Sequence, residues 1–355
     1  MVKPWHFITL LLAVVSLTLG GCAGFGGIKL SEVGKDGTVT YLKIALNQTE
    51  SHPSYKALEQ FGKELKEETG GRYEVEIYAN EQLGSQQEVL QYVKSGAIEM
   101  AIVSGTQLEN VNTDFRVLNM PTTFTSIPQQ IAVLQDQSIV GGLFSSLEES
   151  DNITVLGGYT QGERHIYTTK KVVKKPEDLN GLKIRVQESD MHIRMIRLMG
   201  GTASPLSYGE VYSALQAGVL DGAENNIVSY NTARHMEVAQ NLSYTNHLIG
   251  LDYMIMRADL LKTMPQADRD TFYRVWYDSM DFHTKLWDEF TQESYEAAIA
   301  AGATFHEVDQ EAFQKALAPI KDEFLTTDYE KELYEKIRAK ADVAPNAKAT
   351  EGGAK

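Results

Sequence analysis

The spacing of hydrophobic residues changes repeatedly between that of a strand and that of a helix in the first third of the chain. It predicts strands over residues 38–46, 73–77 and 97–103, with helices between them over residues 53–69 and 86–94. Ser51 is expected to cap the first helix, and the Gly70-Gly71 pair to end it. This alternation predicts an α/β lobe with a mostly parallel sheet.

A second α/β segment is predicted from about Arg164. Its pattern indicates a strand over residues 182–186, helices over residues 190–199 and 207–217, and a second strand over residues 219–223. Ser207 and Glu210 have the spacing of a capping box at the start of the second of these helices. The spacing from Glu210 to Gly218 also repeats that from Glu88 to Gly96, although such a match can arise by chance.

A long helix is predicted after Pro265. No Gly or Pro occurs between Ala267 and Ala301, and apolar residues keep a helical spacing through this stretch. A helix of this length suits a brace that lies across two lobes. The alternative is a pair of surface helices joined by an unmarked turn.

The length of 355 residues exceeds what one hydrophobic core usually organises, so two lobes are expected. After Asn246 the chain is expected to return to the first lobe. The prediction is a signal peptide over residues 1–21, a tether over residues 22–38 and a disordered tail over residues 339–355. Lobe I is predicted to comprise residues 39–161 and 251–290, and lobe II residues 162–250 and 291–338.

The N-terminus has the pattern of a targeting segment. An apolar run from Phe7 to Leu19 is too short to span a bilayer and ends in Gly20-Gly21-Cys22, which resembles a bacterial lipobox. Cys22 is the only cysteine, so no disulfide can form within the chain. The prediction is lipid attachment at Cys22 and an extracytoplasmic protein on the membrane. The alternative is an ordinary secretory signal with a chance cysteine.

Composition and motifs narrow the function classes. The formal net charge is −15 and there is no basic cluster, which argues against nucleic-acid binding. An anion site would therefore have to be a local positive exception. The sequence contains no HExxH, GxSxG or Walker motif and no cysteine pair, so neither a metal nor another cofactor is expected. The absence of motifs makes an enzyme less expected without excluding one.

An ordered set of segments resembles the substrate-binding subunit of tripartite ATP-independent periplasmic (TRAP) transporters. These segments are Gln82-Leu83-Gly84, Gly181 to Val186, Gly209 to Tyr212 with Ala214-Leu215-Gln216, and Asp221 to Asn225. The resemblance covers roughly residues 41–338. It implies an α/β, two-lobe periplasmic-binding-protein-like fold with hinge strands and a long bracing helix. It also implies a cleft that closes on a small organic acid, no enzymatic activity, and membrane subunits as partners.

The resemblance assigns two arginines to the carboxylate of the ligand. Arg185 ends a strand of the family's GLKIRV type, and its guanidinium can bind a carboxylate through two parallel donors. By pattern alone, Arg185 is equally consistent with a surface arginine on a strand. Arg164 lies at the predicted crossing between the lobes, and its alternative role is an ion pair with Glu163 or another acid.

Other candidate contacts lie where predicted strands end. Asn225 follows a strand and offers both a donor and an acceptor, while Ser104 follows the corresponding strand of the first lobe. Tyr208 aligns with an aromatic residue that packs on the ligand in the family. The alternatives are a turn residue for Asn225 and a helix-start packing residue for Tyr208.

Weaker candidates are polar residues near the first and second predicted helices. Asn47 ends the first strand, Glu50 and His52 follow it, and Gln86 lies just after Gln82-Leu83-Gly84. Carboxylate and amide groups at these positions suit the hydroxyl groups of a sugar acid.

The resemblance also suggests a ligand class. The sialic-acid branch carries acidic residues where Gln86 and Ser104 align, whereas the segment from Asp221 to Asn226 is more like the branch that binds hexuronates such as glucuronate or galacturonate. A C4-dicarboxylate or another hydroxy acid is the second choice. A secreted enzyme and a sensory module acting on sugar acids are the other classes. Closure is expected about strands near Gln161 and Gly250.

Overall fold

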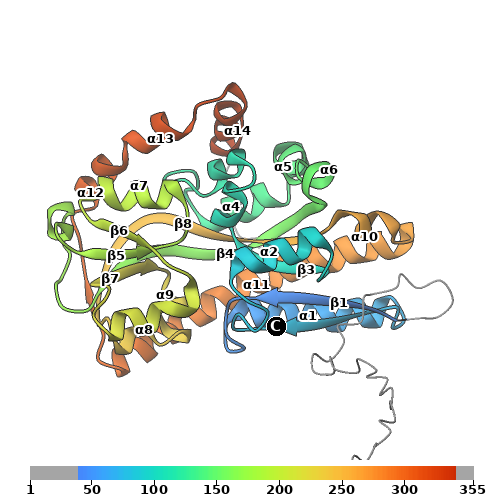
Figure 1. The fold of residues 1–355 in the computed structure, drawn as a ribbon, viewed down its shortest axis with the longest axis horizontal. Helices are drawn as coiled ribbons and strands as arrows, with labels where there is room; N and C mark the ends of the chain where they lie inside the picture. The colour runs from blue at the N-terminus through green and yellow to red at the C-terminus, as the bar shows by residue number, and fades with distance from the viewer. Residues whose placement is uncertain (1–38, 341–355) are drawn as a thin grey trace, which may run out of the picture. The chain divides into compact units, whose positions relative to one another are not determined.

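The computed structural model describes residues 39–340, and helices lie on both sides of one mixed β-sheet (Figure 1). The strands are β1 (Thr40–Leu46), β2 (Tyr73–Tyr78), β3 (Met100–Ser104), β4 (Ile153–Thr168), β5 (Lys183–Val186), β6 (Thr202–Pro205), β7 (Gly222–Asn225), β8 (Asn241–Arg257) and β9 (Thr304–His306).

The helices vary from short turns to one element of 35 residues. They are α1 (Pro53–Glu68), α2 (Gln86–Ser95), α3 (Gly105–Glu109), α4 (Ile127–Leu134), α5 (Gln137–Phe144), α6 (Glu148–Asp151), α7 (Asp190–Leu198), α8 (Val211–Gln216), α9 (Ile227–Thr232), α10 (Ala258–Thr263), α11 (Gln266–Ala300), α12 (Gln310–Leu317), α13 (Pro319–Phe324) and α14 (Asp328–Ala339). The 3₁₀ turns of the described residues are η1 (Thr113–Leu118), η2 (Pro176–Leu179), η3 (Tyr208–Glu210) and η4 (His235–Glu237).

The sheet has the strand order β2-β1-β3-β8-β4-β7-β5-β6, and β9 pairs with β8. At one end, β1 is parallel to β2 and β3, and at the other end β5 is parallel to β6 and β7. The central strands β4 and β8 are antiparallel to each other, and they join β3 and β7 in antiparallel pairs. The prediction of a mostly parallel sheet is therefore correct for the two ends and wrong for the centre.

The two long strands divide the sheet into two halves. Residues 153–160 of β4 pair with residues 251–257 of β8 beside β3, and residues 163–168 pair with residues 241–249 beside β7. We call the part with β2, β1 and β3 the first half, and the part with β7, β5 and β6 the second half. The register of β4 and β8 shifts between Thr160 and Glu163.

The register shift places a glycine directly under the long helix. Gly162 has a φ of +57°, and a Cβ atom there would lie 2.5 Å from Nε1 of Trp287 on α11. A Cβ on Gly250 would lie 2.9 Å from that of Gln161. The chain thus passes between the halves at Gln161 and Gly250, where the sequence predicts the hinge, and glycine permits both the close packing and the left-handed backbone.

Helix α11 is continuous from Gln266 to Ala300, so the alternative of two surface helices is wrong. It packs on α1 in the first half, on β4, and on α9 in the second half, and it passes behind both halves in Figure 1. Trp276 anchors it, because this side chain is fully buried and donates from Nε1 to the Leu156 carbonyl oxygen at 2.8 Å. The predicted brace is therefore present.

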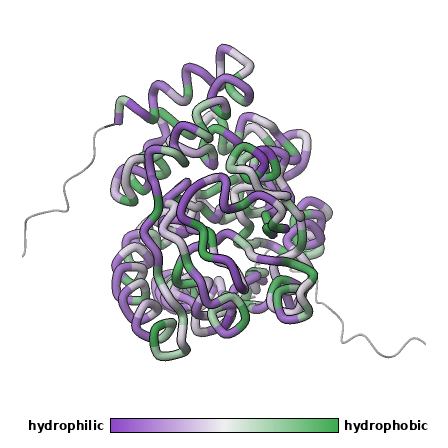
Figure 2. The backbone as a smooth tube through the Cα atoms, turned by 90° about the vertical axis from the view of Figure 1, so that its left-hand side faces the viewer, coloured by the Kyte–Doolittle hydropathy of each residue, from purple (hydrophilic) through white to green (hydrophobic). Residues whose placement is uncertain are grey.

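Hydrophobic residues bury the sheet on both faces, in a large cluster and a smaller one that contains Tyr167, Val211, Leu215 and Tyr230. The hydropathy colours of Figure 2 alternate along the outer helices, as expected for helices that turn one face to the sheet and the other to solvent. Full burial of each large side chain stabilises the fold by about 1.5–3 kcal/mol.

Several predicted helix ends differ from the observed ones. His52, not Ser51, caps α1, because its Nδ1 accepts the Ser54 N–H at 3.1 Å. Ser207 Oγ contacts the Glu210 carboxylate at 2.5 Å without capping the backbone, so the predicted capping box is absent and a 3₁₀ turn opens α8. Ala339 ends α14, so the tail prediction fails there. Lys340 is also described and forms an ion pair with Asp136 at 2.7 Å. The rest of the predicted tail, from residue 341, lies outside the described residues, as do the signal peptide and the tether.

Candidate functional site

The candidate site lies between the two halves, where the strands of both halves end. Hydrogen bonds cross from one half to the other at this place: Ser104 Oγ donates to Gln187 Oε1 at 2.9 Å, and Ser189 Oγ donates to Glu109 Oε2 at 2.7 Å. The Gly209 N–H donates to Glu81 Oε2 at 3.1 Å. The structure therefore shows the two walls in contact.

Arg185 is a buried cation beside this junction. It is 3% exposed, and its Nε and Nη2 groups donate to the Leu206 carbonyl oxygen at 2.9 and 2.7 Å. Its guanidinium lies 6.0 Å from the centre of the Tyr208 ring. Within residues 39–340 it forms no ion pair, and its Nη1 donates to no described residue. Burial lowers the pKa of Arg185, the sign of a charge that lacks a direct partner.

Arg164, in contrast to Arg185, is paired with a carboxylate of the chain. Its Nε and Nη2 groups bind both carboxylate oxygens of Glu224, at 2.6 and 2.8 Å, and its Nη1 donates to Asn225 Oδ1 at 2.8 Å. Arg164 and Glu224 are 3% and 0% exposed. The ion pair named as the alternative role therefore exists, with Glu224 as the partner in place of the adjacent Glu163. Four of the five N–H groups of Arg164 are used within the chain, counting the 3.0 Å bond to the Glu224 carbonyl oxygen.

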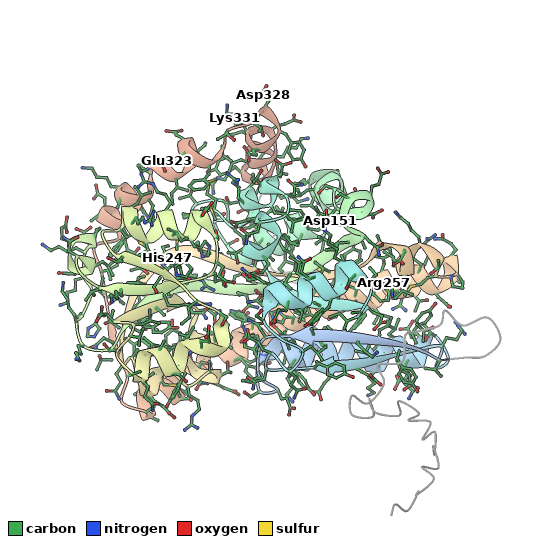
Figure 3. All side chains as sticks on the ribbon, in the orientation of Figure 1. Asp151, His247, Arg257, Glu323, Asp328 and Lys331 are labelled. Carbon is green, nitrogen blue, oxygen red and sulfur yellow. The ribbon has the colours of Figure 1, made fainter. Side chains whose placement is uncertain are left out.

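Histidines surround the Glu224 carboxylate. His247 Nε2 lies 3.3 Å from Oε2, and His192 Nδ1 lies 3.8 Å from Oε1, too far for a hydrogen bond. The nearby Arg164 charge holds the pKa of Glu224 well below its usual value, against the effect of burial. Burial lowers the pKa of His247, so a neutral ring donates from Nε2 while Nδ1 contacts Thr245 Oγ1 at 2.9 Å. Figure 3 labels His247 in the second half and Arg257, on the same strand, in the first.

Asn225 is the last residue of β7, and its side chain is 4% exposed. Its Oδ1 accepts from Arg164 and from the backbone N–H of Asn226, the latter at 2.9 Å. Its amide nitrogen donates to no described residue. Asn225 is thus held beside Arg164 with two donor hydrogens unused.

Ser104 and Gln86 form part of the opposite wall. The Ser104 backbone N–H donates to Gln86 Oε1 at 2.6 Å, and both residues are buried. The glutamine of α2 thus fixes the end of β3, which was not expected from the sequence. Tyr208 is also buried, and its hydroxyl lacks a hydrogen bond of ordinary geometry within residues 39–340. Burial raises the pKa of Tyr208 to about 12.

Two adjoining cavities lie at the junction of the halves and share Glu81 and Tyr208. The smaller has a volume of about 10 Å³, room for one water molecule, and is also lined by Arg185 and Gln86. The larger has a volume of about 260 Å³. Buried polar atoms without a hydrogen-bond partner in the described chain gather around them: Asn47 Oδ1, Glu81 Oε1, Gln107 Oε1 and the Tyr208 hydroxyl. Such atoms normally find a partner in a ligand or water.

The structure brings most of the predicted residues to these walls. Arg185, Tyr208, Gln86 and Asn47 line the cavities, and Ser104 is hydrogen-bonded to the lining residues Gln86 and Gln187. Arg164 and Asn225 line neither cavity and are bonded to each other at the end of β7. Glu50 is exposed and lines neither cavity. Cys22 lies outside the described residues.

Two acidic residues at the site were not predicted. Glu81 lines both cavities, and its left-handed backbone has no signal in the sequence apart from the preceding asparagine. Asp252 lies on β8, is 5% exposed and makes no hydrogen bond through its side chain to another described residue. Burial raises the pKa of Asp252 to about 7, although the Arg164 charge acts in the opposite direction. The aspartate within a strongly hydrophobic strand was a possible signal.

Comparison with known proteins identifies the family. Residues 44–328 match the model of the bacterial extracellular solute-binding proteins, family 7 (DctP). The chain belongs to this family. A solute-binding protein of Chromohalobacter salexigens is 36% identical over 276 residues, which cover 78% of this chain and 82% of that protein.

Solved structures of the same family support the fold. A TRAP periplasmic solute-binding protein from Anaerococcus prevotii with bound D-glucuronate has a TM-score of 0.81 and 35% identity, covering 84% of this chain and 97% of that one. One from Xanthobacter autotrophicus with bound β-D-galacturonate has a TM-score of 0.80 and 30% identity, covering 84% and 100%. This DctP-family chain therefore has the two-lobe periplasmic-binding-protein-like fold and is an extracytoplasmic solute-binding protein of the TRAP type, not an enzyme.

Two further observations concern residues 39–340 alone. Their helices include none with the length and hydropathy of a membrane span. Their His, Asp and Glu side chains do not gather in groups of three or more with the geometry of a metal site.

Proposed function

We propose that this protein binds a hexuronate, such as D-glucuronate or D-galacturonate, for delivery to the membrane subunits of a TRAP transporter. The observation that carries this proposal is Arg185, a buried guanidinium without an ion pair among the described residues, next to a cavity. Burial of an unpaired charge is costly, and a ligand carboxylate would offset that cost. Relatives at least 30% identical over 84% of this chain hold uronates, which supports the choice of acid.

In this proposal the residues of the site contact different groups of the ligand. Arg185 takes the carboxylate through its free Nη1 edge, while Asn225 and the remaining N–H of Arg164 donate to ligand oxygens nearby. Asn47, Gln86, Ser104 and Tyr208 supply polar contacts from the walls, and Glu50 stands as the weakest of the predicted contacts. The predicted lobes, 39–161 with 251–290 and 162–250 with 291–338, close on the ligand about Gln161 and Gly250.

We also propose that Cys22 carries a lipid that keeps the protein at the membrane. The support is the sequence Leu19-Gly20-Gly21-Cys22 at the end of the apolar N-terminal run. Mass spectrometry of the protein from the membrane fraction tests this point. Recovery of a chain whose N-terminus lacks a lipid on Cys22 would reject it.

The ligand is tested by a thermal-shift screen of residues 23–355 against glucuronate, galacturonate, succinate and sialic acid, followed by calorimetry. A ligand at 100 times its Kd stabilises the fold by about 2.7 kcal/mol, which raises the Tm by several degrees at this size. A rise with the uronates supports the proposal. A rise only with succinate would replace the uronate by a C4-dicarboxylate.

A further inference from the structure

The loop after β2 places one carboxylate directly between the two halves. Asn80 and Glu81 have φ values of +54° and +55°, a left-handed conformation that non-glycine residues seldom adopt. The loop is held there because the Asn80 N–H donates to the Gln48 carbonyl oxygen at 2.8 Å and the Glu81 N–H donates to that of Leu46 at 3.2 Å. Glu81 is thus fixed at the carboxyl ends of β1 and β2, the edge where parallel sheets bind ligands.

The two oxygens of the Glu81 carboxylate have different surroundings. Oε2 accepts the Gly209 N–H of the second half, and a Cβ atom on Gly209 would lie only 2.5 Å from it. Oε1 is buried and has no partner among residues 39–340. A buried acceptor without a donor costs about 1–3 kcal/mol, more if it is charged, so its place is explained if a ligand or water supplies the donor.

The position of Glu81 also gives the site a polarity. Glu81 and Arg185 both line the smaller cavity, and Glu81 continues into the larger one. A carboxylate of the ligand is attracted to Arg185 and repelled by Glu81, whereas a hydroxyl group can donate to Glu81 Oε1. An acid with a carboxylate at one end and hydroxyl groups at the other fits both residues, and a compact dicarboxylate fits only one.

We propose that Glu81 is a specificity-determining residue that accepts a hydroxyl group of the ligand while it joins the two halves through Gly209. This inference rests on the proposed function, since it concerns the same site. It adds the chemical reason for which the site selects a hydroxylated monocarboxylate over a dicarboxylate. Burial of the Glu81 carboxylate raises its pKa, which agrees with a group that needs donors at both oxygens.

Calorimetry with D-glucuronate, D-galacturonate and succinate tests the proposal on the wild type, Glu81→Ala, Glu81→Gln and, as the control, Glu67→Ala. Glu67 is an exposed glutamate of α1. Loss of a hydrogen bond to a charged group predicts that Glu81→Ala weakens uronate binding by about 10- to 100-fold. We expect succinate binding to weaken less or to improve, Glu81→Gln to lie between, and Glu67→Ala to match the wild type.

A double-mutant cycle tests the contact between the halves. The methyl group of Gly209→Ala would collide with Glu81 Oε2. As a single replacement, Gly209→Ala should therefore weaken uronate binding by about tenfold. It should have little effect in Glu81→Ala, where that oxygen is absent. Glu81→Gln serves for the affinity comparison if Glu81→Ala does not fold.

The outcomes separate the two proposals. A wild type that binds none of the uronates rejects the proposed function and this inference with it. A wild type that binds uronate with unchanged affinity in Glu81→Ala and Glu81→Gln rejects only the role of Glu81. Additive effects of Gly209→Ala and Glu81→Ala reject the contact as the link between the halves.

Discussion

The replacement Arg185→Ala gives the sharpest test of the site. The guanidinium is 3% exposed, lacks an ion pair in the described chain, and donates only to the Leu206 carbonyl oxygen. In the liganded protein its removal would leave the carboxylate of the ligand buried and unpaired. Truncation of one partner in such a pair costs about 2–5 kcal/mol, which corresponds to a rise in Kd of about 30-fold to several thousand-fold.

In the ligand-free protein, Arg185→Ala should raise the free energy of unfolding or leave it unchanged. Because the buried charge has no carboxylate partner in residues 39–340, its removal breaks no ion pair and relieves a desolvation cost. This gain offsets the loss of the two hydrogen bonds to the Leu206 carbonyl oxygen. We therefore expect an unchanged or higher Tm without ligand and loss of the Tm rise with uronate. Isothermal titration calorimetry and a thermal melt of the same sample measure both effects.

Arg194→Ala is the matched control for this experiment. Arg194 lies on α7 in the same half, and its guanidinium forms an exposed ion pair with Glu323 at 2.7 Å. Exposed pairs contribute about 0–1 kcal/mol, so uronate affinity should stay within a factor of two. Equal affinity of Arg185→Ala and the wild type would refute the reasoning, and so would an equal loss in the control.

Three further predictions concern the groups around the site. Asp252→Asn should stabilise the protein at pH 8. The pKa of Asp252 in the folded protein is about 7, above the ordinary 3.8. The contribution of this aspartate to folding stability therefore falls by at most about 4 kcal/mol as the pH rises from about 4 through 7. Urea melts at pH 4 and pH 8 test this, and an equal difference at both values would contradict it. Glu224→Gln leaves the buried Arg164 charge unpaired and should cost about 3–5 kcal/mol of unfolding free energy, measured by urea denaturation at pH 7; a loss below 1 kcal/mol would contradict the ion-pair argument. Gly162→Ala places a methyl group against Trp287 at a left-handed position and should lower the Tm by several degrees in calorimetric scans, whereas an unchanged Tm would show that α11 moves aside freely.

Local patterns were sufficient to predict most elements of the fold. The sequence predicts α2 and α7 within about a residue, and the Gly- and Pro-free stretch after Pro265 indicates α11 correctly. These predictions succeed because spacing and helix formers act over neighbouring residues. The cap of α1 was misplaced by one residue, because a histidine ring took the role expected of Ser51.

Features that depend on distant partners were harder to predict. Nothing near Arg164 in the sequence indicates that its carboxylate partner is Glu224, 60 residues away and brought beside it by the pairing of β4 with β7. The antiparallel centre of the sheet was missed for the same reason. Glu81 was missed because its role depends on the left-handed loop and on the N–H of Gly209, 128 residues later.

The two long strands have a consequence for the order in which the protein matures. Strand β3 borders β8 and strand β4 depends on it along most of its length, yet β8 begins only at Asn241. During synthesis from the N-terminus, more than half of the chain therefore emerges while the edges of β3 and β4 still lack their partner. Open strand edges favour intermolecular pairing. We therefore expect nascent or truncated chains that stop before Asn241 to aggregate, and a chain cut between the halves to yield no separately folding product.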